Sequence, residues 1–391
     1  MLNIIAAGLP VAMLQLIIYP KVAVIVGDNE YGLMLTIYSV WIMVSNSLGN
    51  VLNNIKLLRF PQYKKLGTEG DIPILLRLWL AASSAIIFFV IWFYCKEFSP
   101  AHIILGVLVA AFIMLKAYLE VGFRIVLNYK AIVINNALLS AGFLIGFLLF
   151  RQFGPWELIF LTGYLFSSIY CAVRTKLLSE PCVKTPIFEE VRKDSHSLVV
   201  ASIIGNLINY ADKLVLYPLM GGAAVSIYYT ATVLGKITGM LTGPINSVIL
   251  SYITRWDNSK SGIFSKVLAI GFGIVTCGYF VTLVFARPVI GYLFPQFVDE
   301  VMKIIPLTTI TVMLTVLTSI LQPFVLKFCN LNWQIVISGV GAAVYFTSAL
   351  VLWKMFGLTG FCIGTIIGAV VKLIIMIAVF YRMKRKTQPA A

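Results

Sequence analysis

Long apolar stretches of about 20 residues recur along the whole chain, and they restrict what it can fold into. Twelve such stretches can be read from its 391 residues, each long enough to cross a bilayer as a helix. Hydrophobic residues make up 60% of the chain and charged residues 12%, about half the charged fraction of an average soluble domain. Too few charges remain to cover a water-facing surface. The sequence therefore predicts an all-α integral membrane protein.

The expected spans are joined by short loops. They cover 2–26, 33–52, 75–95, 101–121, 131–150, 156–173, 198–220, 224–250, 267–285, 303–326, 333–353 and 358–381. The longest loop divides six spans from six. We expect a six-helix bundle over 1–174, a cytoplasmic linker over 175–197, and a second six-helix bundle over 198–391 with a short basic tail. An offset of 194 residues places Gly27 over Gly221, which indicates a parallel repeat of the two bundles.

Lysine and arginine are distributed unequally between the two sets of loops. When residues at the span edges are counted with the loops, twenty of the 30 Lys and Arg residues lie on one side, five on the other and five inside spans. Cytoplasmic loops carry the excess of cations, so both termini are expected in the cytoplasm. No basic segment precedes the first span, and a cleavable signal peptide is not expected. The net charge of +15 is explained by the cations that cytoplasmic loops carry. It therefore does not indicate a nucleic-acid partner, and none is predicted.

Five lysines fall inside the expected spans, where a charge at the bilayer centre costs about 2.5 to 3.5 kcal/mol. Lys236 and Lys372 lie roughly 18 to 20 Å from the external helix ends at 1.5 Å per residue. This depth predicts that both face a watery cavity, the alternative being a buried partner such as Asp212. Lys21 and Lys213 lie near external ends, where each either faces the cavity or extends to the headgroups.

Lys116, the fifth of these lysines, lies four residues before Glu120, which lies four residues before Arg124. This spacing favours a ladder of ion pairs along one helix face. The alternative is that Lys116 belongs to a site.

Polar residues also recur at helical spacing in three expected spans. The stripes are Ser202, Asn206, Asn209 and Lys213; Asn46, Asn50 and Asn53; and Lys236, Gly239, Gly243 and Asn246. Together they predict a lined cavity. For any single asparagine, a hydrogen bond between helices is the competing interpretation.

Motifs for bond-making chemistry are absent from the sequence. It contains no GxxxxGK[ST] loop, no HExxH and no CxxC pair, and its two histidines lie far apart. Among the carboxylates near or within the expected spans, we single out Glu120 and Asp212. We therefore expect no enzyme activity, no cofactor and no metal site. A two-bundle transporter is the first hypothesis.

Two stretches resemble a known family. The first runs from Tyr19-Pro20-Lys21 to Gly27-Asp28-Asn29-Glu30-Tyr31-Gly32, and the second holds Asn209-Tyr210-Ala211-Asp212-Lys213 followed by Gly221 and Ile227-Tyr228. Both are similar to bacterial polysaccharide flippases, the Wzx-like O-antigen and capsule flippases of the multidrug/oligosaccharidyl-lipid/polysaccharide (MOP) exporter superfamily. Those proteins usually begin with a short basic segment, whereas Met1 here opens directly into the helix.

The resemblance implies a function in the bacterial inner membrane. Such proteins carry undecaprenyl-pyrophosphate-linked oligosaccharides from the cytoplasmic to the periplasmic leaflet, by alternating access through a cationic lumen driven by ion gradients. The polymerase and chain-length machinery of the same pathway are implied partners. The candidates are Lys236, Lys372, Lys213, Lys21 and Lys116 for the pyrophosphate, Asn46, Asn50, Asn206, Asn209 and Asn246 for sugars, and Asp212 and Glu120 for ion coupling.

Two other functions are weighed against this one. A drug/cation antiporter would favour buried carboxylates, and five lysines in the spans against the two carboxylates singled out oppose it. A polyprenyl-linked glycan polymerase would be expected to have a large external loop, and the longest external segment here, 287–303, is short.

Overall fold

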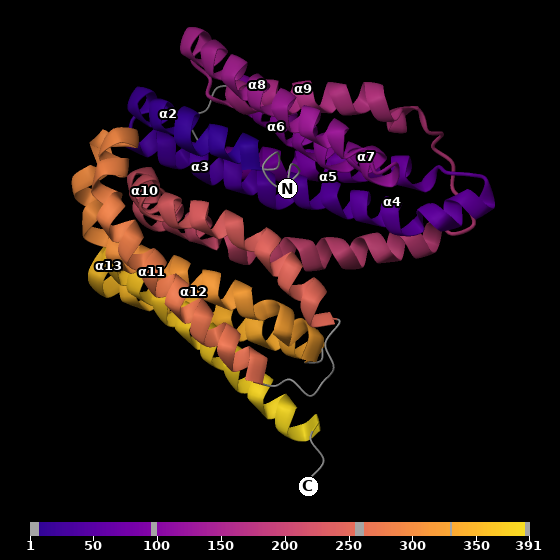
Figure 1. Cartoon of the computed structure of the whole chain (residues 1–391). Coiled ribbons are helices and arrows are strands. Elements are labelled where there is room, and N and C mark those ends of the chain that lie inside the picture. The colour runs from indigo at the N-terminus through magenta and orange to yellow at the C-terminus, as the bar shows by residue number, and fades with distance from the viewer. Residues whose placement is uncertain (1–7, 95–99, 255–261, 329–330, 388–391) are drawn as a thin grey trace. The chain divides into compact units, whose positions relative to one another are not determined.

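A computed structural model describes residues 8–94, 100–254, 262–328 and 331–387 of the chain (Figure 1). Side chains at 208–209, 236–254, 262–263, 326–328, 331–332, 334–335 and 383–387 lie outside this description. The described residues form helices joined by short turns, without a strand. The all-α class predicted from the sequence is confirmed.

Ten helical stretches of the described chain are long and apolar enough to cross a membrane. Two of them, Tyr210–Gly235 and Val336–Arg382, contain a glycine with non-helical backbone angles, Gly221 and Gly357. Each of these two stretches therefore holds two helices. Ten stretches, two of them double, correspond to the twelve helices that the sequence predicts. The chain is a multi-pass membrane protein.

The chain divides into two compact units, Met1–Val225 and Ser226–Ala391. The first holds η1 (Met13–Ile18), α2 (Tyr19–Val26), α3 (Asp28–Trp41), η2 (Ile42–Asn46), α4 (Ser47–Leu66), α5 (Asp71–Tyr94), α6 (Pro100–Leu119), α7 (Val121–Ile125), α8 (Tyr129–Phe153), α9 (Glu157–Thr175), η3 (Leu177–Ser179) and the start of α10 (Phe188–Thr254). The second holds the rest of α10, α11 (Gly262–Leu293), η4 (Pro295–Phe297), α12 (Val298–Phe328) and α13 (Leu331–Thr387). Six-helix bundles over 1–174 and 198–391 stay a prediction.

Each unit contains a tightly packed helical hairpin that turns at a glycine. In the first unit α8 and α9 meet at Gly154 and lie side by side (Figure 1), with Thr162 Oγ1 donating to Gly142 O at 2.8 Å. In the second unit the two arms of α13 meet at Gly357, with Ser348 Oγ donating to Gly364 O at 2.9 Å. The same device, a hydroxyl bonded to a glycine carbonyl, lets both helix pairs approach closely.

The core of the second unit lies where α11, α12 and α13 pack together. Phe264 and Phe380 stack with ring centroids 3.8 Å apart, and Phe324 meets Phe264 edge to face at 5.5 Å. These rings fill the space between three helices whose outer faces remain apolar, as expected for helices surrounded by lipid.

The turn between α2 and α3 repeats in α10. Gly27 has φ 80° and ψ 173°, and Gly221 has φ 78° and ψ −179°. These are the two residues that the 194-residue offset superposes. Both adopt a conformation that only glycine reaches without strain, so the matched geometry supports the repeat inferred from the sequence.

These two turns also contact one another within the first unit. Asn29 Oδ1 accepts a hydrogen bond of 3.0 Å from the Ala223 N–H. A Cβ added to Gly32 would lie 1.9 Å from the Gly222 carbonyl oxygen, and one added to Gly222 would lie 2.0 Å from the Asn29 carbonyl oxygen. Only the absence of side chains allows the two backbones to meet.

A Gly32→Ala substitution is therefore expected to force the two turns apart. The clash is with backbone, which cannot move aside as a side chain can, so we expect a loss of about 1 to 3 kcal/mol. The melting temperature of the purified protein measures it. Gly205→Ala is the matched control, because a Cβ there meets nothing within 4 Å. Equal melting temperatures of the two variants would contradict this packing.

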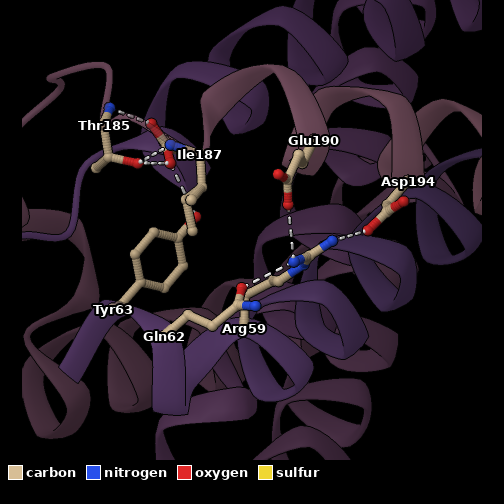
Figure 2. A network of polar contacts seen from close by, with 8 residues as sticks. Arg59, Gln62, Tyr63, Thr185, Ile187, Glu190 and Asp194 are labelled. Atoms are coloured by element: carbon tan, nitrogen blue, oxygen red, sulfur yellow. Dashed lines mark hydrogen bonds and ion pairs between the residues drawn. The ribbon is translucent and has the colours of Figure 1, made fainter. Parts of the chain in front are cut away.

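The linker between the predicted halves is bound to the first unit. We call residues 180–197 the strap. Asp71, at the start of α5, accepts hydrogen bonds from the Thr185 N–H (2.7 Å) and hydroxyl and from the Tyr63 hydroxyl (3.1 Å). Arg59 on α4 forms ion pairs with Glu190 (3.3 Å) and Asp194 (Figure 2). The linker is thus an ordered part of the first unit, and α10 begins at Phe188, before the predicted span start at 198.

A buried lysine anchors the first residue of the strap. Lys56 is 1% exposed, and its Nζ lies 2.7 and 2.8 Å from the Glu180 carboxylate oxygens and also pairs with Glu69. Burial raises the pKa of Glu180, while the hydrogen bond and charge of Lys56 oppose this rise. One ammonium therefore bridges two carboxylates and offsets one of their two negative charges.

Candidate functional site

A cluster of polar side chains lies between α6, α8 and α9 of the first unit. Lys116 Nζ is 2.8 Å from Glu120 Oε1, which also accepts a hydrogen bond of 2.9 Å from Asn135 Nδ2. Ser167 Oγ donates to Asn135 Oδ1 at 2.7 Å. We call these four residues the Lys116 cluster. Glu120 lies at the break between α6 and α7, which leaves its carboxylate free to turn toward α8.

The predicted ladder is formed only in part. The Lys116–Glu120 pair is present, but Arg124 donates instead to Asn53 Oδ1 at 2.7 Å. Asn53 in turn donates to the Ala117 carbonyl at 2.8 Å. Tertiary partners on α4 therefore replace the second rung that helical spacing favoured.

Two tyrosines extend the polar region toward α3. The hydroxyls of Tyr38 and Tyr164 are 3.1 Å apart, and Tyr164 interacts electrostatically with Lys116. Tyr38 also stacks on Phe160 with ring centroids 4.4 Å apart. The hydroxyl pair and the Lys116–Glu120 ion pair thus belong to one polar region between α3 and α6.

The candidate pair in α10 is also formed. Lys213 is 5% exposed, and its Nζ lies 3.8 Å from Asp212 Oδ1 and 5.3 Å from the centroid of the Tyr210 ring. Asp212 also accepts a hydrogen bond of 2.9 Å from the Lys213 N–H. These contacts hold the lysine beside Asp212 and Tyr210, and its role in a site stays a prediction. Lys21, by contrast, is exposed on α2.

The asparagines predicted to contact sugars differ in their burial and in their hydrogen bonds. Asn206 Nδ2 donates to Ser47 Oγ at 2.6 Å and so joins α10 to α4. Asn46 is half-buried at the end of the π-helical segment η2, and Asn50 is exposed. Asn206 forms the bond between helices that was the competing interpretation, and a sugar contact by these residues stays a prediction.

Three predicted residues lie outside the described side chains: Lys236, Asn209 and Asn246. Lys372 is described and half-buried in α13, where it packs along Gly341; a Cβ on that glycine would lie 3.0 Å from Lys372 Cβ. Among the described side chains, no carboxylate forms an ion pair with Lys372.

Sequence reasoning missed two groups of buried charges. It singled out Glu120 and Asp212 among the carboxylates, but Glu157 at the start of α9 is 1% exposed and lies 2.8 Å from His102 on α6. It also counted Lys56 as a loop cation. A carboxylate at a span edge, 55 residues from its partner, gives no periodic signal. Within the described part of the chain, no group of three or more His, Cys, Asp or Glu residues could hold a metal ion.

Comparisons with known proteins identify the fold. No protein-family model and no curated protein sequence matches the chain. Among solved structures, lipid II flippase MurJ in an inward closed conformation matches with a TM-score of 0.68 and 13% identity, covering 92% of this chain and 89% of its own. An inward-facing multidrug resistance MATE family transporter of the MOP superfamily matches with a TM-score of 0.67 and 15% identity, covering 99% and 96%. The chain has the fold that these transporters and flippases share.

Proposed function

We propose that the chain flips undecaprenyl-pyrophosphate-linked oligosaccharide repeat units from the cytoplasmic to the periplasmic leaflet of a bacterial inner membrane. The repeat units would serve surface polysaccharide synthesis, such as O-antigen or capsule, alongside the polymerase and chain-length proteins of that pathway. Transport would proceed by alternating access, with both termini in the cytoplasm. The similarity in fold to a lipid II flippase supports a lipid-linked cargo.

The observation that carries the proposal is the charge of the second unit. Its only acidic residues are Asp257, Asp299 and Glu300, of which the last two lie in the first turn of α12. None of the three falls within a predicted span, whereas Lys236 and Lys372 do. A lysine without a buried counter-ion is costly in a bilayer, and an anionic pyrophosphate offers the compensation that the unit lacks.

In the first unit two of the three candidate cations are already paired. Lys116 pairs with Glu120 and Lys213 with Asp212. We propose that these two lysines and Lys21 meet the pyrophosphate in passage, when a carboxylate that binds a proton or a cation releases its lysine. Glu120 and Asp212 would then be the ion-coupling groups, and the asparagine stripes would bond sugar hydroxyls.

A drug/cation antiporter remains the second candidate, because multidrug transporters share the fold. A cationic cargo requires carboxylates that are open to it. Both deep carboxylates named above have a lysine as their partner, and the second unit supplies none in its predicted spans. These contacts favour an anionic cargo.

The test is the lipid extract of a strain that lacks this chain. If the chain flips repeat units, a complete undecaprenyl-pyrophosphate oligosaccharide accumulates while surface polysaccharide disappears. The native gene restores both, and serves as the control. An unchanged lipid pool and surface glycan, together with increased sensitivity to cationic drugs, would overturn the proposal in favour of the antiporter.

A further inference from the structure

A buried carboxylate and an imidazole meet at one end of the first unit, outside the Lys116 cluster. Glu157 is 1% exposed, and its Oε1 lies 2.8 Å from His102 Nδ1. Its other oxygen, Oε2, is buried without a hydrogen-bond partner among the described residues. A permanently ionised carboxylate would leave that oxygen uncompensated. A proton placed on that oxygen would displace no hydrogen bond of the described residues.

A second carboxylate, at the surface of the first unit, interacts electrostatically with this pair. Glu30 on α3 is exposed, and it interacts electrostatically with both Glu157 and His102. These are the titratable groups that act on Glu157 from the neighbouring helices α3 and α6. With a neutral imidazole the three groups are doubly negative, and each proton taken up removes one charge. Glu30 thus places an exposed carboxylate within electrostatic range of the buried pair.

Two neighbouring features of the structure act on the charge of His102 in opposite directions. It lies in the first turn of α6, where the backbone N–H groups disfavour an imidazolium, whereas the adjacent Glu157 carboxylate favours one. The two influences oppose each other. At a separation of 2.8 Å the two groups bind a proton as a pair.

Aromatic rings enclose the start of α9. Trp156, directly before Glu157, packs against Trp41 and Phe160 with ring centroids 5.7 and 6.3 Å apart. A wall of this kind excludes water and keeps the local dielectric constant low, so interactions between the titrating groups are strong.

We propose that Glu157 and His102 form a proton-binding site at the end of the first unit that the loop charges predict to be external, with Glu30 as its entry group. The site binds protons from the outer compartment and links their uptake to the state of the first unit. The inference goes beyond the proposed function, because proton binding here does not depend on the cargo.

The chain contains two histidines, His102 and His196, so the titration of His102 can be followed in the full-length protein by NMR of ¹⁵N-labelled histidine. The His196→Gln variant assigns the signals. We expect His102 to titrate within roughly pH 5 to 8, and its midpoint to move by about one pH unit or more in Glu157→Gln, as loss of a charge at this distance requires. Glu30→Gln, a mild change at an exposed position, is expected to move it less.

His196 is the internal control, since it packs against Trp79 on another part of the unit, with ring centroids 5.1 Å apart. Its NMR signals should be unaffected by Glu157→Gln. A His102 signal that does not titrate over this range, or whose midpoint is unmoved in both Glu157→Gln and Glu30→Gln, would overturn the proposal. Because the readout is proton binding, it is independent of whether the chain flips lipid-linked glycans.

Discussion

Replacing Lys372 by methionine is expected to reduce surface-glycan export at least about tenfold, which corresponds to losing one charge-assisted contact of about 1.5 kcal/mol with the pyrophosphate. Methionine keeps the length of the side chain and removes its charge. Lys372 has no ion-pair partner among the described side chains, so the substitution leaves no carboxylate unpaired. Membrane abundance and melting temperature are therefore expected to stay unchanged.

The chain supplies a matched control for this variant. Lys354 lies on the same element, α13, and is exposed, so Lys354→Met should leave export unaffected. Lys372→Arg keeps the positive charge and should retain most of the export. Full surface-glycan levels in Lys372→Met at normal abundance would remove this lysine from the mechanism.

Replacing Lys56 by methionine is expected to destabilise the first unit by about 3 kcal/mol, because removing one partner of a buried ion pair leaves the others uncompensated. Glu180 and Glu69 would then face each other without the ammonium that separates them. Their side chains are 16% and 32% exposed, so water reduces the loss. A fall of several degrees in melting temperature and earlier protease cleavage in the strap would show it.

The pH dependence of this variant has a definite sign. Without Lys56, burial and the neighbouring Glu69 carboxylate raise the pKa of Glu180 in the folded state, with no ammonium to oppose the rise. The folded protein then binds protons more readily than the unfolded chain, so stability recovers as the pH falls and is lost as the pH rises. The variant carrying Glu69→Gln and Glu180→Gln as well should regain stability near neutral pH. A Lys56→Met variant as stable as the unsubstituted protein at all pH values contradicts this role.

The regular recurrence of apolar segments along the sequence made much of the fold predictable. The spans could be placed because a segment of about 20 apolar residues crosses a bilayer as a helix. Only in that conformation are its backbone hydrogen bonds all formed within the segment. The repeat could be inferred from Gly27 and Gly221 because a positive φ requires glycine at the same point of both turns. The early start of α10 at Phe188 could not, since it depends on Asp71 and Thr185, residues more than a hundred positions apart.

In the candidate sites, too, contacts within one helix were predictable from the sequence and contacts between helices were not. The Lys116–Glu120 pair was foreseeable, because both residues lie on one helix and the spacing alone brings them together. Its partners Asn135 and Ser167 come from other helices and carry no local signal. The same holds for Glu157 with His102 and for Lys56 with Glu180. Each of these pairs joins segments that only packing brings into contact.

By itself, the sequence determined that this protein lies in a membrane and how often its apolar segments recur, and it predicted which lysines lie too deep to reach the headgroups. These properties follow from hydropathy and helical spacing, which act over a few turns of one segment. Only the tertiary structure decided which charges are neutralised. An ion pair depends on distances of about 3 Å between side chains, and those distances arise when helices that are remote in sequence pack against one another.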